Sequence, residues 1–177
     1  ETKSSGPHRF VKKYLESKKQ RFQNKQKLEK LHQAILKKFP EASVPSDQPW
    51  REFDLAIDYC EDVPRWPTAR VHELMQFCES HSAYAKLSSI HVNIWFGKYD
   101  KWTCVKRVLK DFLKIKDLHE VVYLGDSPND EPFFKELPLT VGVANIKRFL
   151  NVLQYKPVYI TENPGGLGFA EFVESTW

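Results

Sequence analysis

Two aspartates four positions apart follow an apolar run in the stretch VVYLGDSPNDEPFF, residues 121–134. The run VVYL predicts a short buried strand, and Asp126 and Asp130 stand in the loop that leaves it. Ligands of α/β sheets bind beyond the carboxyl ends of the strands, so both carboxylates are expected at such a site. Carboxylate oxygen suits Mg²⁺, which also keeps water and substrate phosphate as ligands. These residues therefore predict a metal and phosphate site.

The same two aspartates also have a purely structural interpretation. Asp126 can cap a turn, and Asp130 can cap the helix predicted to begin at Glu131, since both are common roles of aspartate. Two adjacent carboxylates without a cation repel each other and raise each other's pKa, a cost that a bound metal relieves. The loop by itself leaves both interpretations open.

From residue 97 onward, helical and strand patterns alternate, and this alternation must position the loop. The expected segments are a helix over 102–112, strands at 121–125, 139–145 and 157–161, and helices at 131–136, 146–153 and 168–175. Their strands are apolar on both faces, which is typical of a parallel sheet between helices. We therefore expect an α/β module over residues 97–177.

Residues 1–96 follow a different pattern. The segment 7–39 has no internal proline or glycine and predicts a long helix, and a second helix is expected over 71–80. The segments 51–59 and 88–96 alternate polar and apolar residues, as half-buried strands do. These features predict an α+β module with an antiparallel sheet.

The basic residues are concentrated at the N-terminus. Residues 1–38 hold 12 Lys and Arg against 3 Asp and Glu, a net +9, although the whole chain carries only +4. A solvated lysine-rich helix face is favoured over a nucleic-acid surface, so no nucleic-acid partner is expected. No run of about 18 apolar residues exists, so no membrane span is expected. Three cysteines without CxxC spacing favour a reducing, cytoplasmic setting.

The segment YLGDSPNDEPFF resembles the fourth signature motif, GDxxND, of the haloacid dehalogenase superfamily of phosphohydrolases. KWTCVKRVL, which begins at Lys101, resembles the third motif, a lysine that opens a helix. The tail VGVAN and PVYITENPGGLGFAEFV resembles the end of the subgroup with a large α/β cap, which includes Cof-like, sucrose-phosphate and mannosyl-phosphoglycerate phosphatases. The resemblance implies that residues 97–177 are the C-terminal part of a Rossmann-like hydrolase core and that residues 1–96 are its cap.

The resemblance implies roles for five residues. Asp126 is expected to bind Mg²⁺ directly, and Asp130 to assist at the metal or to orient Lys101. The lysine is expected to neutralise the phosphoryl oxygens as a compact point charge. Ser127 and Asn129 are expected to hydrogen-bond the phosphate or the groups around it.

Three features set this sequence apart from the family pattern. Trp102 stands where the subgroup usually has glycine, and Lys98 competes with Lys101, which is favoured because it opens the helix. The family's nucleophile is the first aspartate of a DxD pair, yet none of the nine aspartates here has another two positions away. The resemblance therefore implies that an N-terminal core segment, in cis or as a separate chain, supplies the nucleophile and that this chain alone is inactive.

The function that the resemblance implies is a Mg²⁺-dependent phosphatase that acts through an aspartyl-phosphate on a small phosphate monoester, with a sugar phosphate favoured. The cap would select the leaving group, and the polar strand residues Asp54, Asp58, His91 and Asn93 are candidates for binding sugar hydroxyls. A solvated sheet face is the alternative for these four. The alternative for the whole chain is a catalytically inactive module that binds partners through its basic N-terminal helix.

Overall fold

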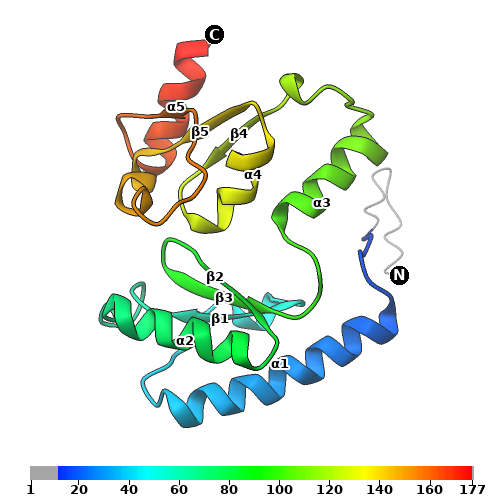
Figure 1. The fold of residues 1–177 in the computed structure, drawn as a ribbon, viewed down its shortest axis with the longest axis vertical. Coiled ribbons are helices and arrows are strands. Elements are labelled where there is room, and N and C mark those ends of the chain that lie inside the picture. The colour runs from blue at the N-terminus through cyan, green and yellow to red at the C-terminus, as the bar shows by residue number, and fades with distance from the viewer. Residues whose placement is uncertain (1–11, 177) are drawn as a thin grey trace.

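The computed structural model describes residues 12–176, and two separate sheets organise them (Figure 1). The elements around the first sheet are α1 (Lys18–Lys38), the 3₁₀ turn η1 (Gln48–Trp50), β1 (Asp54–Asp58), α2 (Thr68–Ser80), β2 (Tyr84–Leu87) and β3 (His91–Trp95). Those around the second are α3 (Lys101–Val108), its π-helical continuation η2 (Leu109–Leu113), η3 (Leu118–Glu120), β4 (Val122–Gly125), η4 (Pro128–Asp130), α4 (Glu131–Glu136), β5 (Leu139–Gly142), η5 (Ala144–Phe149), β6 (Tyr159–Ile160) and α5 (Gly165–Thr176). The expected α/β class, with one antiparallel and one parallel sheet, is confirmed.

The first sheet is antiparallel and has the strand order β1–β3–β2. The alternating segments 51–59 and 88–96 form β1 and β3, as predicted, with Leu55 opposite Ile94 and Ile57 opposite Val92. The sequence prediction missed β2, which has only four residues and follows α2 after a short turn. Four residues are too few for an alternating pattern to stand out from its surroundings.

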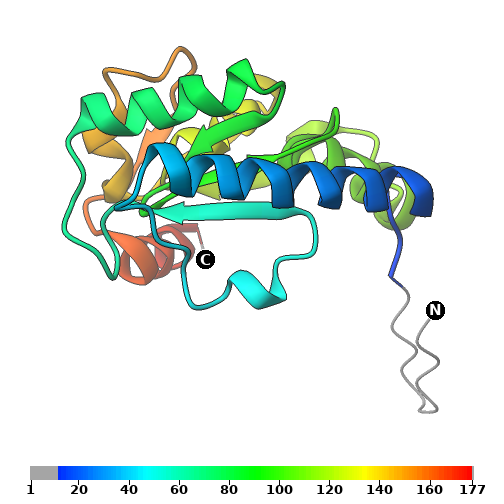
Figure 2. The same ribbon diagram turned by 90° about the horizontal axis from the view of Figure 1, so that it is seen from below.

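The helices α1 and α2 cover one face of this sheet. Seen from below in Figure 2, both helices run in front of the strands. Leu31 and Ile35 of α1 and Leu74 of α2 pack with Ile57 and Ile94 of the strands in one buried core. The opposite face of the sheet, which carries the alternate side chains, is thereby left for other contacts.

The first helix begins later than the sequence predicted. Residues 7–11 of the predicted helix lie outside the described residues, and 12–17 are not helical. The helix starts at Lys18 because the Ser17 hydroxyl caps it by accepting the Gln20 N–H at 3.2 Å. In its first half Asn24 is the buried residue, whereas Phe22 is exposed. No helix in residues 12–176 has the length and apolar character needed to cross a membrane.

The second sheet is parallel, with the strand order β4–β5–β6. Its strands and the helices α3, α4 and α5 occur where the alternating pattern placed them. The helix expected over 146–153 is instead the shorter 3₁₀ segment η5. Two buried clusters flank the sheet, one around Phe133 and Leu109 and one around Ile146 and Phe134, and Tyr123 packs against both.

A glycine joins the two halves of the chain. Gly97 follows β3 and precedes α3, and its φ of +121° lies in the region that disfavours side chains. A Cβ atom there would also lie 2.7 Å from the Glu16 Oε1 atom. The chain therefore changes direction at a position that only glycine occupies without strain.

Two phenylalanines at opposite ends of α1 test this packing. Phe39 is 0% exposed and contacts Trp66 and Phe77, whereas Phe22 is 63% exposed. We expect Phe39→Ala to lower the free energy of unfolding by about 3–5 kcal/mol, because it leaves a cavity. The matched variant Phe22→Ala should change it by less than about 0.5 kcal/mol. Urea denaturation followed by circular dichroism measures both, and equal losses would contradict the packing.

Candidate active site

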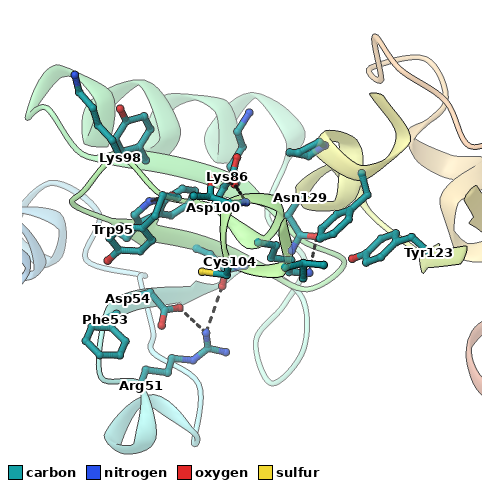
Figure 3. A pocket seen from close by; sticks show the side chains of 18 residues that line it. Arg51, Phe53, Asp54, Lys86, Trp95, Lys98, Asp100, Cys104, Tyr123 and Asn129 are labelled. Carbon is teal, nitrogen blue, oxygen red and sulfur yellow. Dashed lines mark hydrogen bonds and ion pairs between the residues drawn. The ribbon is translucent and has the colours of Figure 1, made fainter. Parts of the chain in front are cut away.

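A cleft of about 970 Å³ opens between the antiparallel sheet and the loop that follows β4 (Figure 3). From the second half of the chain it is lined by Lys101, Tyr123, Asn129 and Phe133, among others. From the first half it is lined by the face of the antiparallel sheet that α1 and α2 do not cover. The strand β2 contacts η4, so the sheet closes the side of the cleft opposite the GDSPND loop.

Asp130, the last residue of the GDSPND loop, is the acceptor on which its hydrogen bonds converge. Only 2% of it is exposed, and each of its two carboxylate oxygens accepts two hydrogen bonds of 3.3 Å or less. Oδ1 accepts from Lys101 Nζ at 2.9 Å and from the Tyr123 hydroxyl at 2.8 Å. Oδ2 accepts the backbone N–H groups of Asp126 at 3.0 Å and Ser127 at 3.3 Å. The carboxylate therefore shapes the turn and holds the lysine at the same time.

The position of Lys101 follows from local capping. Asp100 precedes α3, and its carboxylate accepts the Thr103 N–H at 2.7 Å, so Lys101 is the first residue of the helix. Its ammonium group bridges Asp130 and the Asn129 Oδ1 atom, which is 3.2 Å away. Together these contacts hold one positive charge at the edge of the cleft.

The competing lysine is placed differently. Lys98 also lines the cleft, but it extends away from Asn129 in Figure 3. Within residues 12–176 its ammonium group has no hydrogen bond or ion pair. Of the two candidates, the structure brings only Lys101 to Asp130.

Asp126 is arranged in the opposite way to Asp130. Its backbone N–H is engaged, yet no donor among the described residues hydrogen-bonds its half-buried carboxylate. Such a hard-oxygen group fits a divalent cation that completes its shell with water and phosphate. Asp130 does not fit as a direct ligand in this arrangement, because its lone pairs are already occupied. Its geometry suits the other expected task, which is to orient Lys101.

Gly125 explains why the aspartates follow a glycine. A Cβ atom at this position would lie 2.7 Å from the Asp130 Cβ atom and 2.9 Å from its Cγ atom. The last residue of β4 must therefore lack a side chain for the Asp130 carboxylate to fold back over the turn. The GD pair of the motif is a packing requirement as well as a chemical one.

The two polar residues of the loop have different surroundings. Ser127 is 1% exposed, and its hydroxyl donates to Asn129 Oδ1 at 2.9 Å. Because Lys101 also donates to that oxygen, the Asn129 amide is oriented, and its Nδ2 group has no acceptor among the described residues. Asn129 lines the cleft. The structure thus makes Asn129 available to a ligand and leaves Ser127 as its support.

Sequence reasoning missed Tyr123. Its hydroxyl donates to Asp130, and its ring stacks on Phe133 with 3.6 Å between centroids. Burial, followed by the negative charge of Asp130 and their hydrogen bond, raises the pKa of the Tyr123 phenol, so it remains a donor. Spacing was the one signal in the sequence. Tyr123 stands two positions before Gly125, so both lie on the side of β4 that meets Asp130.

The four cap candidates separate into two pairs. Asp54 and Asn93 line the cleft, whereas Asp58 and His91 lie outside its lining. Arg51, which the sequence did not single out, joins the first pair by donating from Nη1 to Asp54 Oδ2 at 2.7 Å. The other side chains of residues 1–96 in the lining include Phe53, Tyr84, Lys86 and Trp95.

The second pair belongs to another cluster. Asp58, Glu61 and His91 each present one potential metal-ligating atom, and these atoms lie within 4.8 Å of one another. Burial alone raises the pKa of Asp58, but the N–H groups of Glu61, Asp62 and Cys60 outweigh burial and hold it below its usual value. His91 Nε2 lies 2.8 Å from Glu61 Oε2. The carboxylates of Asp58 and Glu61 thus already have hydrogen-bond partners in the protein itself.

Comparison with solved structures supplies the fold. A Thermoplasma acidophilum protein superimposes with a TM-score of 0.58 and 18% identity over 86% of this chain and 60% of its own. The sucrose-phosphatase of Synechocystis sp. PCC6803, solved with sucrose and phosphate, gives 0.62 and 14% over 87% and 64%. A haloacid dehalogenase-like hydrolase of B. subtilis gives 0.53 and 16% over 71% and 41%. This chain has the haloacid dehalogenase-like fold.

This chain spans less than two thirds of each of these three structures. The sequence matches no protein-family model and no curated protein. At these identities the likeness establishes the fold, and function must be argued from the site.

The close approach at Gly125 gives a direct test. We expect Gly125→Ala to lower the free energy of unfolding by about 1–3 kcal/mol, because Asp130 must shift away from the new methyl group. The control is Gly166→Ala, where no atom lies within 4 Å of the added Cβ and a helical alanine is neutral or stabilising by up to about 1 kcal/mol. Thermal and urea unfolding measure both; a harmless Gly125→Ala would refute the packing.

Proposed function

We propose that the chain is the cap and the C-terminal part of the core of a Mg²⁺-dependent phosphatase. Residues 1–96 would form the cap and residues 97–177 the core segment. The observation that carries the proposal is the ion pair between Lys101 and buried Asp130 at the carboxyl end of β4. Beside it lies the carboxylate of Asp126, which accepts no hydrogen bond from the part of the chain that the structure describes. The fold, shared with a sucrose-phosphatase, supports it.

The residues divide the work of phosphoryl transfer, which depends on positioning and charge neutralisation. Asp126 would hold the metal, which polarises a phosphoryl oxygen when bound. Lys101 neutralises developing charge, and Asn129 Nδ2 donates to a phosphoryl oxygen. Asp130 and Tyr123 keep the ammonium group of the lysine in place.

The nucleophile is proposed to come from outside this chain. No DxD pair occurs in the sequence, and the outer edge of β4 pairs with no strand of residues 12–176. A strand added there would bring its carboxyl end next to Asp126, since neighbouring parallel strands end at the same edge. This segment, in cis or as a separate chain, would carry the aspartate that forms the aspartyl-phosphate.

The substrate is proposed to be a small phosphate monoester, and a sugar phosphate is favoured. The cleft is at the upper end of the usual size of small-molecule sites, which is about 300–1,000 Å³. The sheet face that lines it is polar and aromatic, with Asp54 and Asn93 near Trp95. The basic helix α1 lies on the other face of the sheet (Figure 1), so its positive charges would not contact a substrate in the cleft.

Phosphate release by the complete protein tests the metal assignment. We expect Asp126→Asn to lower kcat/KM by about 100-fold or more, because it removes the charge that holds the cation. Chelation should abolish activity, and added Mg²⁺ should restore it in the parent protein. Asp111→Asn is the control, since among residues 12–176 its side chain forms only an exposed 3.5 Å pair with Arg107. An Asp126→Asn protein as active as its parent would count against the metal assignment. A complete parent protein that releases no phosphate would count against the phosphatase and favour an inactive binding module.

The two candidate lysines give a matched comparison. Lys101→Met should lower kcat by about 100-fold, the scale of losing one charge-stabilising donor. Lys98→Met should change kcat little, because Lys98 does not contact Asp130. Steady-state kinetics of both variants decide the assignment, and a larger loss at Lys98 would reverse it.

A further inference from the structure

A second, smaller pocket lies on the side of the antiparallel sheet that α1 and α2 cover. Its volume of about 380 Å³ is within the usual range of small-molecule sites, which is about 300–1,000 Å³. It is lined by residues of α1, of the turn after α2 and by the residue after β3, namely Lys27, Lys30, Leu31, His81, Ser82 and Phe96. None of them lines the cleft of the candidate active site. The two cavities are therefore separate.

Two lysines give this pocket a positive charge. Lys27 and Lys30 are three positions apart on α1, so their side chains are neighbours on one face of the helix. The ammonium group of Lys27 lies over the Phe96 ring, 5.4 Å from its centroid, which places the charge without neutralising it. No acidic residue of the described part of the chain lines the pocket. Whereas Lys38 of the same helix is paired with Glu73 at 3.3 Å, the two lysines of the pocket form no ion pair within residues 12–176.

The end of α2 does not account for these charges. Lysines near the end of a helix often bind its last carbonyl groups, which have no partner inside the helix, but here the chain supplies those partners itself. The carbonyl oxygen of Phe77 accepts from His81 Nδ1 at 2.8 Å, and that of Cys78 accepts from the His81 N–H at 3.0 Å. The Glu79 carbonyl oxygen accepts from the Ser82 N–H at 2.8 Å. The lysine ammonium groups therefore remain for a ligand.

Ser82 occupies a backbone conformation that favours glycine. Its φ is +61°, in the left-handed region, at the position after a helix end where glycine is the usual residue. It lines the pocket, and its hydroxyl forms no hydrogen bond with any group of residues 12–176. Backbone strain that is kept at such a position points to a task for the side chain. The hydroxyl group is therefore the third polar group that the pocket offers.

We propose that Lys27, Lys30 and Ser82 bind the phosphoryl group of a small molecule in this pocket. Such a group carries about −1.5 to −2 charges at pH 7 and three acceptor oxygens, which match two ammonium groups and one hydroxyl. A carboxylate carries a single charge and would leave one lysine uncompensated. His81 Nδ1 carries the hydrogen donated to the Phe77 carbonyl oxygen, so Nε2 adds a donor when the ring is protonated. The inference is independent of the proposed phosphatase activity, because the pocket shares no residue with the cleft.

Titration of the full chain with inorganic phosphate at constant ionic strength tests the site. In ¹H–¹⁵N spectra, phosphate should shift the backbone amide of Ser82. The double variant Lys27→Gln/Lys30→Gln should raise the Kd of this response about 10-fold, since it removes two charge-assisted hydrogen bonds from partly solvated groups. Lys18→Gln/Lys25→Gln removes two charges from the same helix outside the pocket and should leave the Kd unchanged. No shift at Ser82, or equal weakening by both double variants, would overturn the proposal.

Ser82→Gly should change stability and phosphate binding in opposite directions. Glycine adopts a positive φ without strain, so we expect the Tm to rise by about 2–4 °C. Loss of the hydroxyl should raise the Kd for phosphate about 5-fold. Lys114→Gly is the matched control, because Lys114 has a φ of +58° outside the pocket; its Tm should also rise, with phosphate binding unchanged. A Ser82→Gly protein that binds phosphate as its parent does would overturn the role of the hydroxyl.

A longer polyanion is the competing ligand, because α1 carries further lysines outside the pocket, such as Lys19 and Lys37. Titration with AMP and, separately, with a 10-nucleotide single-stranded RNA distinguishes the two. AMP should shift the Ser82 amide, and Lys18→Gln/Lys25→Gln should not weaken its binding. RNA that binds at least about 100-fold more tightly than AMP, with an affinity that falls steeply with salt and in that control variant, would assign the surface to nucleic acid and overturn the small-molecule site.

Discussion

The buried carboxylate of Asp130 is the constraint around which the second half of the molecule is arranged. A charge that is 2% exposed must be balanced by a counter-charge and by hydrogen bonds. Lys101 supplies the charge, Tyr123 a hydroxyl and the turn two N–H groups. Because the Lys101 side chain is 54% exposed, solvent screens part of the attraction, and the hydrogen bonds from Tyr123 and the turn carry the rest of the balance. The end of β4 and the start of α3 are therefore tied together.

The two faces of the antiparallel sheet have separate tasks. One face buries Leu55, Ile57 and Ile94 against two helices and provides the stability of this half of the chain. The other face contributes little to the core, so it can carry charged, amide and aromatic side chains above the loop. Because alternate residues of a strand point to opposite faces, a single strand serves both purposes.

Two polar groups at opposite ends of that face show how similar residues receive different roles. At one end, three backbone N–H groups occupy the carboxylate of Asp58, and His91 lies against Glu61. At the other end, Arg51 donates to one oxygen of Asp54 and to the amide oxygen of Asn93, and both residues line the cleft. Residue type alone did not separate these cases; the neighbouring backbone and a third side chain did.

The sequence by itself determined the alternation of strands and helices and the loop with its two aspartates, because periodicity and turn residues are local signals. The resemblance of KWTCVKRVL to a family motif singled out Lys101, and its place at the start of a predicted helix favoured it over Lys98. Tertiary structure alone decided what surrounds these residues. Tyr123 reaches Asp130 only because β4 and its loop fold together, and Arg51 reaches Asn93 across 42 positions of sequence. Such contacts depend on packing between distant segments, which no local pattern encodes.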